Sequence, residues 1–147
     1  MRWSHVKVEA IKANVRYSLV GGPFGSELTT RDYVEEGVPV IRGTNLPDER
    51  SFNDDNFVFV REEKADQLIA NNACPGDVIF TQRGTLGQVG VIPIESRFPR
   101  YLISQSQMKL KVNPEKANTQ FVFYFFRHPG TVQKIKNHAL ISGVPHI

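Results

Sequence analysis

Two carboxylates and a lysine have the spacing that best fits catalytic chemistry in this sequence. Pro47-Asp48 precedes Glu62-Glu63-Lys64, so the chain contains the loose P-D…E-x-K pattern of Mg²⁺-dependent nucleases. In such a site the carboxylates of Asp48 and Glu62 would hold the metal, and Lys64 would orient the water or stabilise the developing charge. The pattern needs its E-x-K on an alternating core strand, whereas 62–64 has the composition of a charged first helical turn. Because the structural context does not fit, we keep an Mg²⁺-dependent nuclease only as a second possibility.

Other catalytic and metal-binding patterns are absent from the sequence. Ser26 lies in GGPFGS rather than in the G-x-S-x-G turn of a hydrolase nucleophile. The four histidines lack H-E-x-x-H spacing, and there is no P-loop and no G-x-G-x-x-G stretch opening a helix. Cys74 is the only cysteine, which excludes an internal disulfide and every multi-cysteine zinc motif. These patterns give no support for a metal or a cofactor, and we expect neither.

Short strands and short helices would position any site. Strand-like residue types predict strands at 38–42, 57–60, 78–81, 89–92, 101–103 and 107–112, and a short strand or a strand that leads into a turn at 6–11. Short helices are expected at 30–36 and 62–70, and a helical region follows a start at 113–115. Because proline cannot donate a backbone hydrogen bond, we expect either that the strand containing Pro39 lies at a sheet edge or that Pro39 is among the first residues of its strand. The sequence thus predicts an α+β fold, a single domain over 1–147 with twisted, mostly antiparallel sheets.

Two periodic patterns predict which side chains are buried. Apolar residues alternate with lysines along 107–112, which indicates a strand with one buried and one solvent-facing side. Phe121, Tyr124 and Phe125 have the i, i+3, i+4 spacing of one helix face, and we expect this stripe to lie in the core.

Charge is distributed unevenly along the 147 residues, although the net charge is only +3. Four basic residues and one acid give 1–26 a net +3, six basic and thirteen acidic residues give 27–96 a net −7, and eight basic residues and one acid give 97–147 a net +7. These segments either interleave in space or form a positive surface for a polyanion, most often nucleic acid. The single cysteine and the lack of an apolar run of about 20 residues predict a soluble, cytoplasmic protein.

Several stretches, taken in order, resemble one family. They are GGPFGS (21–26), GVPVIRGTNL (37–46), PGDVIFTQRGTLG (75–87), ISQ (103–105), FYFF (123–126) and SGVPHI (142–147). In this combination the chain resembles a target recognition domain of a type I restriction–modification specificity subunit, over nearly its whole length. The resemblance implies the N-terminal half of such a subunit, with the connecting helix and the second recognition domain absent.

The resemblance also implies a role and partners. Such a domain binds duplex DNA sequence-specifically, reads one half of a bipartite target and performs no catalysis. In the full complex, long helices between two such domains dock methyltransferase subunits, and a translocating nuclease subunit joins for cleavage.

Family members share these motifs while reading different DNA sequences, so the base readers are expected between the motifs, in 46–61 and 94–101. Arginine can bond guanine, and asparagine can pair with adenine. The candidates for base contact are Arg97, Arg100, Tyr101, Arg50 and Asn53. The candidates for phosphate contact are Lys109, Lys111, Arg83, Gly22 and Ser26. The alternative for each charged candidate is an ordinary solvated side chain.

Overall fold

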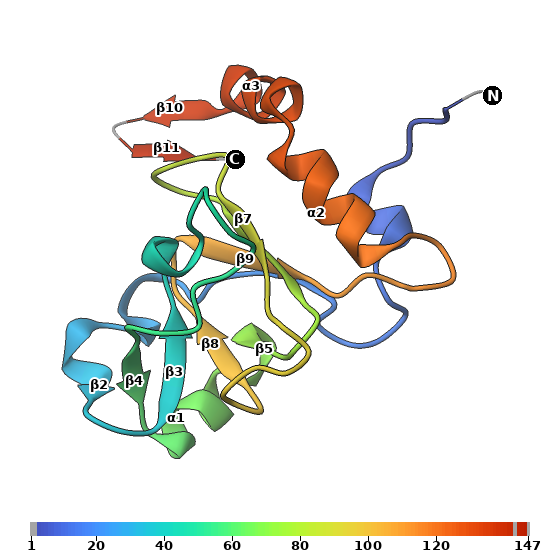
Figure 1. Ribbon diagram of the computed structural model, residues 1–147. Helices are drawn as coiled ribbons and strands as arrows, with labels where there is room; N and C mark the ends of the chain where they lie inside the picture. Colours follow the sequence, from blue (N-terminus) through green and yellow to red (C-terminus); the bar gives the residue numbers. More distant parts are fainter. Residues whose placement is uncertain (1–2, 143, 147) are drawn as a thin grey trace.

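The computed structural model describes residues 3–142 and 144–146 and contains two sheets packed face to face (Figure 1). The first sheet has four antiparallel strands in the order β1-β9-β6-β7. Their bounds are Leu19–Gly21 (β1), Gln107–Leu110 (β9), Val78–Thr81 (β6) and Val89–Val91 (β7). The β6–β7 pair is a hairpin, as its sequence predicted.

The second sheet has five strands in the order β2-β4-β3-β8-β5. Their bounds are Tyr33–Val34 (β2), Val58–Val60 (β4), Val38–Ile41 (β3), Tyr101–Ile103 (β8) and Asn72–Ala73 (β5). Only β3 and β8 are parallel among the described pairs, so the predicted α+β fold with mostly antiparallel sheets is confirmed. A separate hairpin joins β10 (Leu140–Ser142) to β11 (Val144–His146), so the closing motif 142–147 is described only in part.

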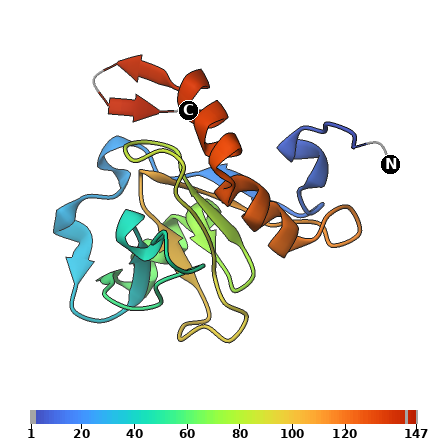
Figure 2. The ribbon, with the colours of Figure 1, turned by 45° about the horizontal axis from the view of Figure 1, so that its top comes forward.

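Helices cover the outer faces of both sheets. The α-helices are α1 (Glu62–Gln67), α2 (Thr119–Arg127) and α3 (Pro129–His138). Short 3₁₀ turns are η1 (Val8–Ile11), η2 (Gly25–Glu27), η3 (Thr30–Asp32), η4 (Gly43–Asn45) and η5 (Ile69–Asn71). One core cluster lies between the sheets, a second lies between the first sheet and α2, and a third lies between the second sheet and α1. Figure 2 shows α2 crossing the first sheet.

This layering corrects the expectation for 107–112. Met108 and Leu110 lie on the side of β9 that packs toward α2, which agrees with the predicted buried side, but the opposite side faces the second sheet rather than water. Lys109 is therefore buried, and its ammonium group donates to the backbone carbonyl of Asn72. Burial lowers the pKa of Lys109. The alternation of apolar residues and lysines correctly predicted that successive side chains of β9 point to opposite faces of the sheet. It did not predict that both faces are covered.

The aromatic stripe on α2 is also different from the prediction. Phe121, Tyr124 and Phe125 are exposed, whereas Val122 and Phe123 occupy the core. The expected stripe and the buried residues lie on different faces of a helix that is apolar nearly all round, so spacing alone did not identify the buried face. The ring of Phe121 stacks on Trp3, with centroids 6.3 Å apart.

Three local features agree with the expectations only in part. Within 6–11, residues Val8–Ile11 form the turn η1, so the expected turn is present but the strand before it is not. The helix expected to start at 113–115 begins at Thr119, where the Asn118 side chain accepts from the Phe121 N–H at 3.0 Å. Pro39 is the second residue of β3, so it lies among the first residues of its strand, as one of the two expectations had it. The strand is central in its sheet and not at the edge.

Candidate nucleic-acid interface

A groove lies where the chain passes between the two sheets. Loop 22–25 leaves the first sheet after β1, loop 104–106 enters it before β9, and residues 42–43 and 82–83 directly follow the ends of β3 and β6. These segments line two adjoining hollows that share Gly25 and Gln105. We call this surface the junction groove.

A buried polar network fixes the floor of the junction groove. The Thr81 hydroxyl donates to the Gln88 side-chain oxygen at 2.8 Å, and the Gln88 amide donates to the Gly43 carbonyl at 3.2 Å. The Gln107 amide donates to the Thr81 hydroxyl at 3.1 Å, and the Ser104 hydroxyl donates to the Gln107 side-chain oxygen. A network whose members satisfy one another holds both sheets in one relative position.

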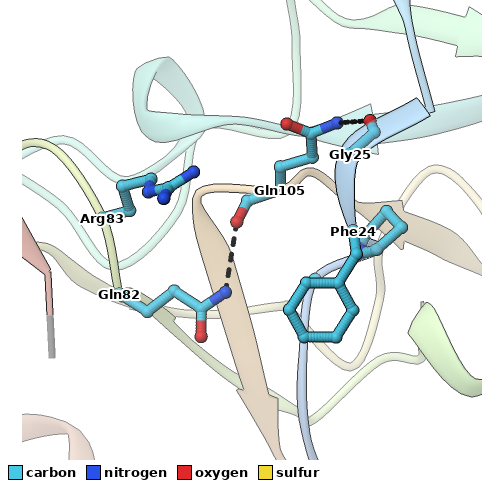
Figure 3. Close-up of a pocket in the computed structure, with 7 residues that line it drawn as sticks. Phe24, Gly25, Gln82, Arg83 and Gln105 are labelled. Atoms are coloured by element: carbon cyan, nitrogen blue, oxygen red, sulfur yellow. Dashed lines mark hydrogen bonds between the residues drawn. The ribbon is translucent and has the colours of Figure 1, made fainter. Parts of the chain in front are cut away.

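The glycine loop is tied to the same junction (Figure 3). A β-carbon on Gly22 would lie 2.0 Å from the Ser104 carbonyl oxygen, so only glycine permits this approach. The Gln105 amide donates to the carbonyls of Gly25 and, at 2.8 Å, Leu28. The Gln82 amide donates to the Gln105 carbonyl at 3.1 Å. The loop that carries Phe24 and Gly25 is therefore anchored.

Arg42 and Arg83 give the junction groove its charge. Arg83 lines the first hollow and Arg42 the second, and neither forms an ion pair with any residue in the described part of the chain. The Nε atom of Arg42 is buried, and it has no hydrogen-bond partner among the described residues. Because an uncompensated guanidinium favours an anion nearby, the groove is suited to a phosphate or a base acceptor edge.

The two segments expected to read bases instead contact each other. The Arg97 guanidinium pairs with the Asp55 carboxylate at 3.2 Å, and the Arg97 backbone N–H donates to Asp54 at 2.8 Å. Tyr101 is fully buried, and its hydroxyl donates to Asp54 at 2.6 Å. The acidic middle of the chain thus neutralises part of the basic tail, and a buried Tyr101 cannot contact a base in this conformation.

The remaining base-contact candidates also have partners within the chain. Arg100 pairs with Asp66 at 2.9 Å and with Glu62 at 2.5 Å. Arg50 donates to the side-chain oxygen of Asn53 at 3.0 Å, and both are exposed or half-buried on one loop.

The phosphate-contact candidates separate into three groups. Lys109 is buried, and Lys111 pairs with the buried carboxylate of Asp77 at 2.8 Å. Gly22 is buried and serves close packing. Arg83 and Ser26 stay exposed, Arg83 in the junction groove itself and Ser26 directly after its Gly25. We keep Arg83 and Ser26 as predicted contacts.

The residues of the nuclease alternative have separate engagements. Glu62 pairs with Arg100, and Lys64 pairs with Asp32 at 3.5 Å, where the Thr29 backbone N–H lowers the pKa of the Asp32 carboxyl. Asp48 lies in an exposed turn, and its backbone carbonyl accepts a hydrogen bond from the Arg127 guanidinium at 2.8 Å. No group of three or more potential metal ligands is found among the described residues. The arrangement does not support a nuclease.

Arg42 was missed because it lies in the strand motif that the sequence assigned to scaffolding. Its signal is nevertheless visible in the sequence. Both Arg42 and Arg83 stand immediately before a glycine, and each comes one or two residues after a buried strand. An arginine at that position lies at the end of a sheet, beside a turn.

Solved structures share this fold. The crystal structure of the type I restriction-modification system S subunit from M. genitalium matches 99% of this chain and 31% of its own, with 16% sequence identity and a TM-score of 0.59. A structure from work on complex assembly and conformational transition of the type I R-M system matches 74% of this chain and 24% of its own, with 15% identity and a TM-score of 0.52. The fold is the one that the sequence resemblance implied, and the chain spans less than a third of either protein.

No family model and no curated protein matches the sequence. Among the described residues, no helix has the length and apolar character needed to cross a membrane.

Proposed function

We propose that this chain is one target recognition domain of a type I restriction–modification specificity subunit, and that it binds duplex DNA sequence-specifically through the junction groove. The observation that carries the proposal is the pair of guanidinium groups, Arg42 and Arg83, that line the groove without an anionic partner among the described residues. The fold likeness to S subunits supports the same role.

The two arginines have different surroundings and are assigned different contacts. Arg42 is half-buried, with its Nε atom enclosed, and it suits a phosphate that fixes the register of the duplex. Arg83 is exposed and follows β6 on a turn, so it can reach a base edge as well as a phosphate. Affinity then comes mainly from phosphate neutralisation, and specificity comes from base contacts.

The proposed domain performs no chemistry and reads one half of a bipartite target. Methylation and cleavage would come from methyltransferase subunits and a translocating nuclease subunit in the full complex. The nuclease alternative receives no support, because Glu62 pairs with Arg100 and Lys64 pairs with Asp32.

Salt-dependent binding to a fluorescein-labelled duplex tests the proposal. Each lost phosphate contact should reduce the slope of log K against log salt by about 1. Arg42→Gln and Arg83→Gln should each weaken binding, and Arg42→Gln should lower the slope. Arg97→Gln removes the same charge from an ion pair outside the groove and serves as the matched control. Unchanged affinity and slope in the Arg42→Gln/Arg83→Gln double variant would overturn the proposal.

A further inference from the structure

Phe24 is the most exposed large hydrophobic side chain in the described part of the chain, with an exposed fraction of 84%. It stands at the tip of the glycine loop and lines the junction groove together with Gln82 and Arg83. Figure 3 shows its ring across the hollow from Arg83, with Gln82 and Gln105 between them. Single exposed apolar side chains are common on protein surfaces, but this one lines the groove and is therefore available to a bound ligand.

The loop that carries Phe24 is held rigidly. The Phe24 backbone N–H donates to the Glu27 carboxylate at 3.1 Å, and the next carbonyl, that of Gly25, accepts from the Gln105 amide. Pro23, directly before Phe24 in the chain, is buried, and its ring fixes one backbone angle. The ring is therefore presented to solvent at a defined place rather than on a flexible tail.

We propose that the Phe24 ring is a wedge that inserts between adjacent base pairs of the duplex bound in the junction groove and bends the duplex there. This inference rests on the proposed function. Apolar side chains inserted at a base step unstack it and kink the duplex, while nearby cations hold the backbone on either side. One such cation, Arg83, lines the same hollow as Phe24, and a second, Arg42, lines the adjoining hollow.

Loss of the Phe24 ring should affect DNA binding differently from loss of either arginine. Stacking uses the face of the ring, which every base can match, so Phe24 contributes affinity and bending with little choice among bases. It carries no charge, so its loss leaves the salt slope unchanged. A duplex that is already unstacked at one step requires less energy to deform and is expected to bind more tightly.

The test uses end-labelled duplexes for energy transfer, one fully paired and one with a single central C·C mismatch. Wild-type protein should raise transfer between the ends, and it should prefer the mismatched duplex by about fivefold, in the range of one stacking contact. Phe24→Ala should lose the bend and the preference but keep the salt slope, and Phe24→Trp should keep all three. Tyr124→Ala removes another exposed ring, on α2, with an exposed fraction of 66%, and should behave as wild type.

Failure of the wedge and failure of the proposed function are distinguishable. If Phe24→Ala still bends the duplex and keeps the mismatch preference while Arg83→Gln weakens binding, the wedge is overturned and the DNA-binding role stands. If wild-type protein binds neither duplex in a salt-dependent way, the proposed function and the wedge fall together. Circular dichroism of the variant checks the fold, which a side chain this exposed should not affect.

Discussion

The Tyr101 hydroxyl donates to the Asp54 carboxylate at 2.6 Å, and this bond joins β8 to the loop before β4. The same carboxylate accepts from the Arg97 backbone N–H. Asp54 thus holds together two segments that the sequence assigned to DNA reading. Their contact pairs Arg97 with an acid, whereas Arg42 and Arg83 in the junction groove form no ion pair with any described residue.

The Tyr101–Asp54 bond predicts a loss of stability at alkaline pH. Burial raises the pKa of Tyr101 to about 12, compared with an unfolded value of about 10. Because the folded pKa is the higher one, the contribution is complete below about pH 10 and is lost between about pH 10 and 12. Urea unfolding of wild type and Tyr101→Phe should show a difference in unfolding free energy that shrinks over this window. A difference that stays constant with pH would contradict the assignment.

Arg100 is expected to matter for stability and not for DNA. Its guanidinium pairs with Glu62 and Asp66 and donates to the Asn72 side chain at 3.1 Å. Since both carboxylates are largely exposed, Arg100→Gln should lower the free energy of unfolding by only about 1 kcal/mol. DNA affinity should stay unchanged, whereas Arg83→Gln should show the reverse pattern. Denaturation and anisotropy on both variants check this, and a loss of affinity in Arg100→Gln would restore it as a DNA contact.

Arg127 is predicted to be a structural anchor. It donates to four backbone carbonyls, those of Pro47, Asp48, Arg50 and Val89, at 2.8 to 3.2 Å. Arg127→Ala leaves these oxygens without that donor and should lower the free energy of unfolding by about 2 kcal/mol.

The control for Arg127 is Lys134→Ala, an exposed basic residue on α3, which should change the free energy of unfolding by no more than about 0.5 kcal/mol. Equal effects of the two substitutions would show that the carbonyl contacts do not stabilise the fold.

Gly22 is predicted to serve packing rather than phosphate contact. A methyl group there would collide with the Ser104 carbonyl and force loop 22–25 away from loop 104–106. Gly22→Ala should therefore lower the free energy of unfolding by about 2 kcal/mol or more. Ser26→Ala, on the exposed part of the same loop, should leave stability unchanged and weaken DNA binding slightly. Thermal unfolding of both variants decides the matter, and a fully stable Gly22→Ala protein would contradict the packing role.

The fold could be predicted largely from local signals. Residues 78–81 and 89–91 form their hairpin because strand-forming runs flank a tight turn, and 38–41 and 101–103 form strands for the same reason. Periodicity did not report how many layers the molecule has. Lys109 is buried because a second sheet covers β9, and that contact depends on residues distant in the sequence.

The candidate site was harder to predict because charge pairing is a tertiary property. Arg97 and Arg100 stood out in a basic segment, yet their acidic partners come from the acidic middle of the chain. Arg83 was recognised from sequence, while Arg42 was hidden in a strand motif. Only the junction of the two sheets brings the loops of these two arginines to one groove.

Selection from a pool of randomised duplexes tests the central claim most directly. The account predicts that the purified chain enriches one short, defined sequence, consistent with half of a bipartite target, and that Arg83→Gln relaxes the choice at one or more positions of that sequence. A pool that stays random after repeated rounds, or an enriched sequence that the Arg42→Gln/Arg83→Gln variant selects equally well, would contradict it.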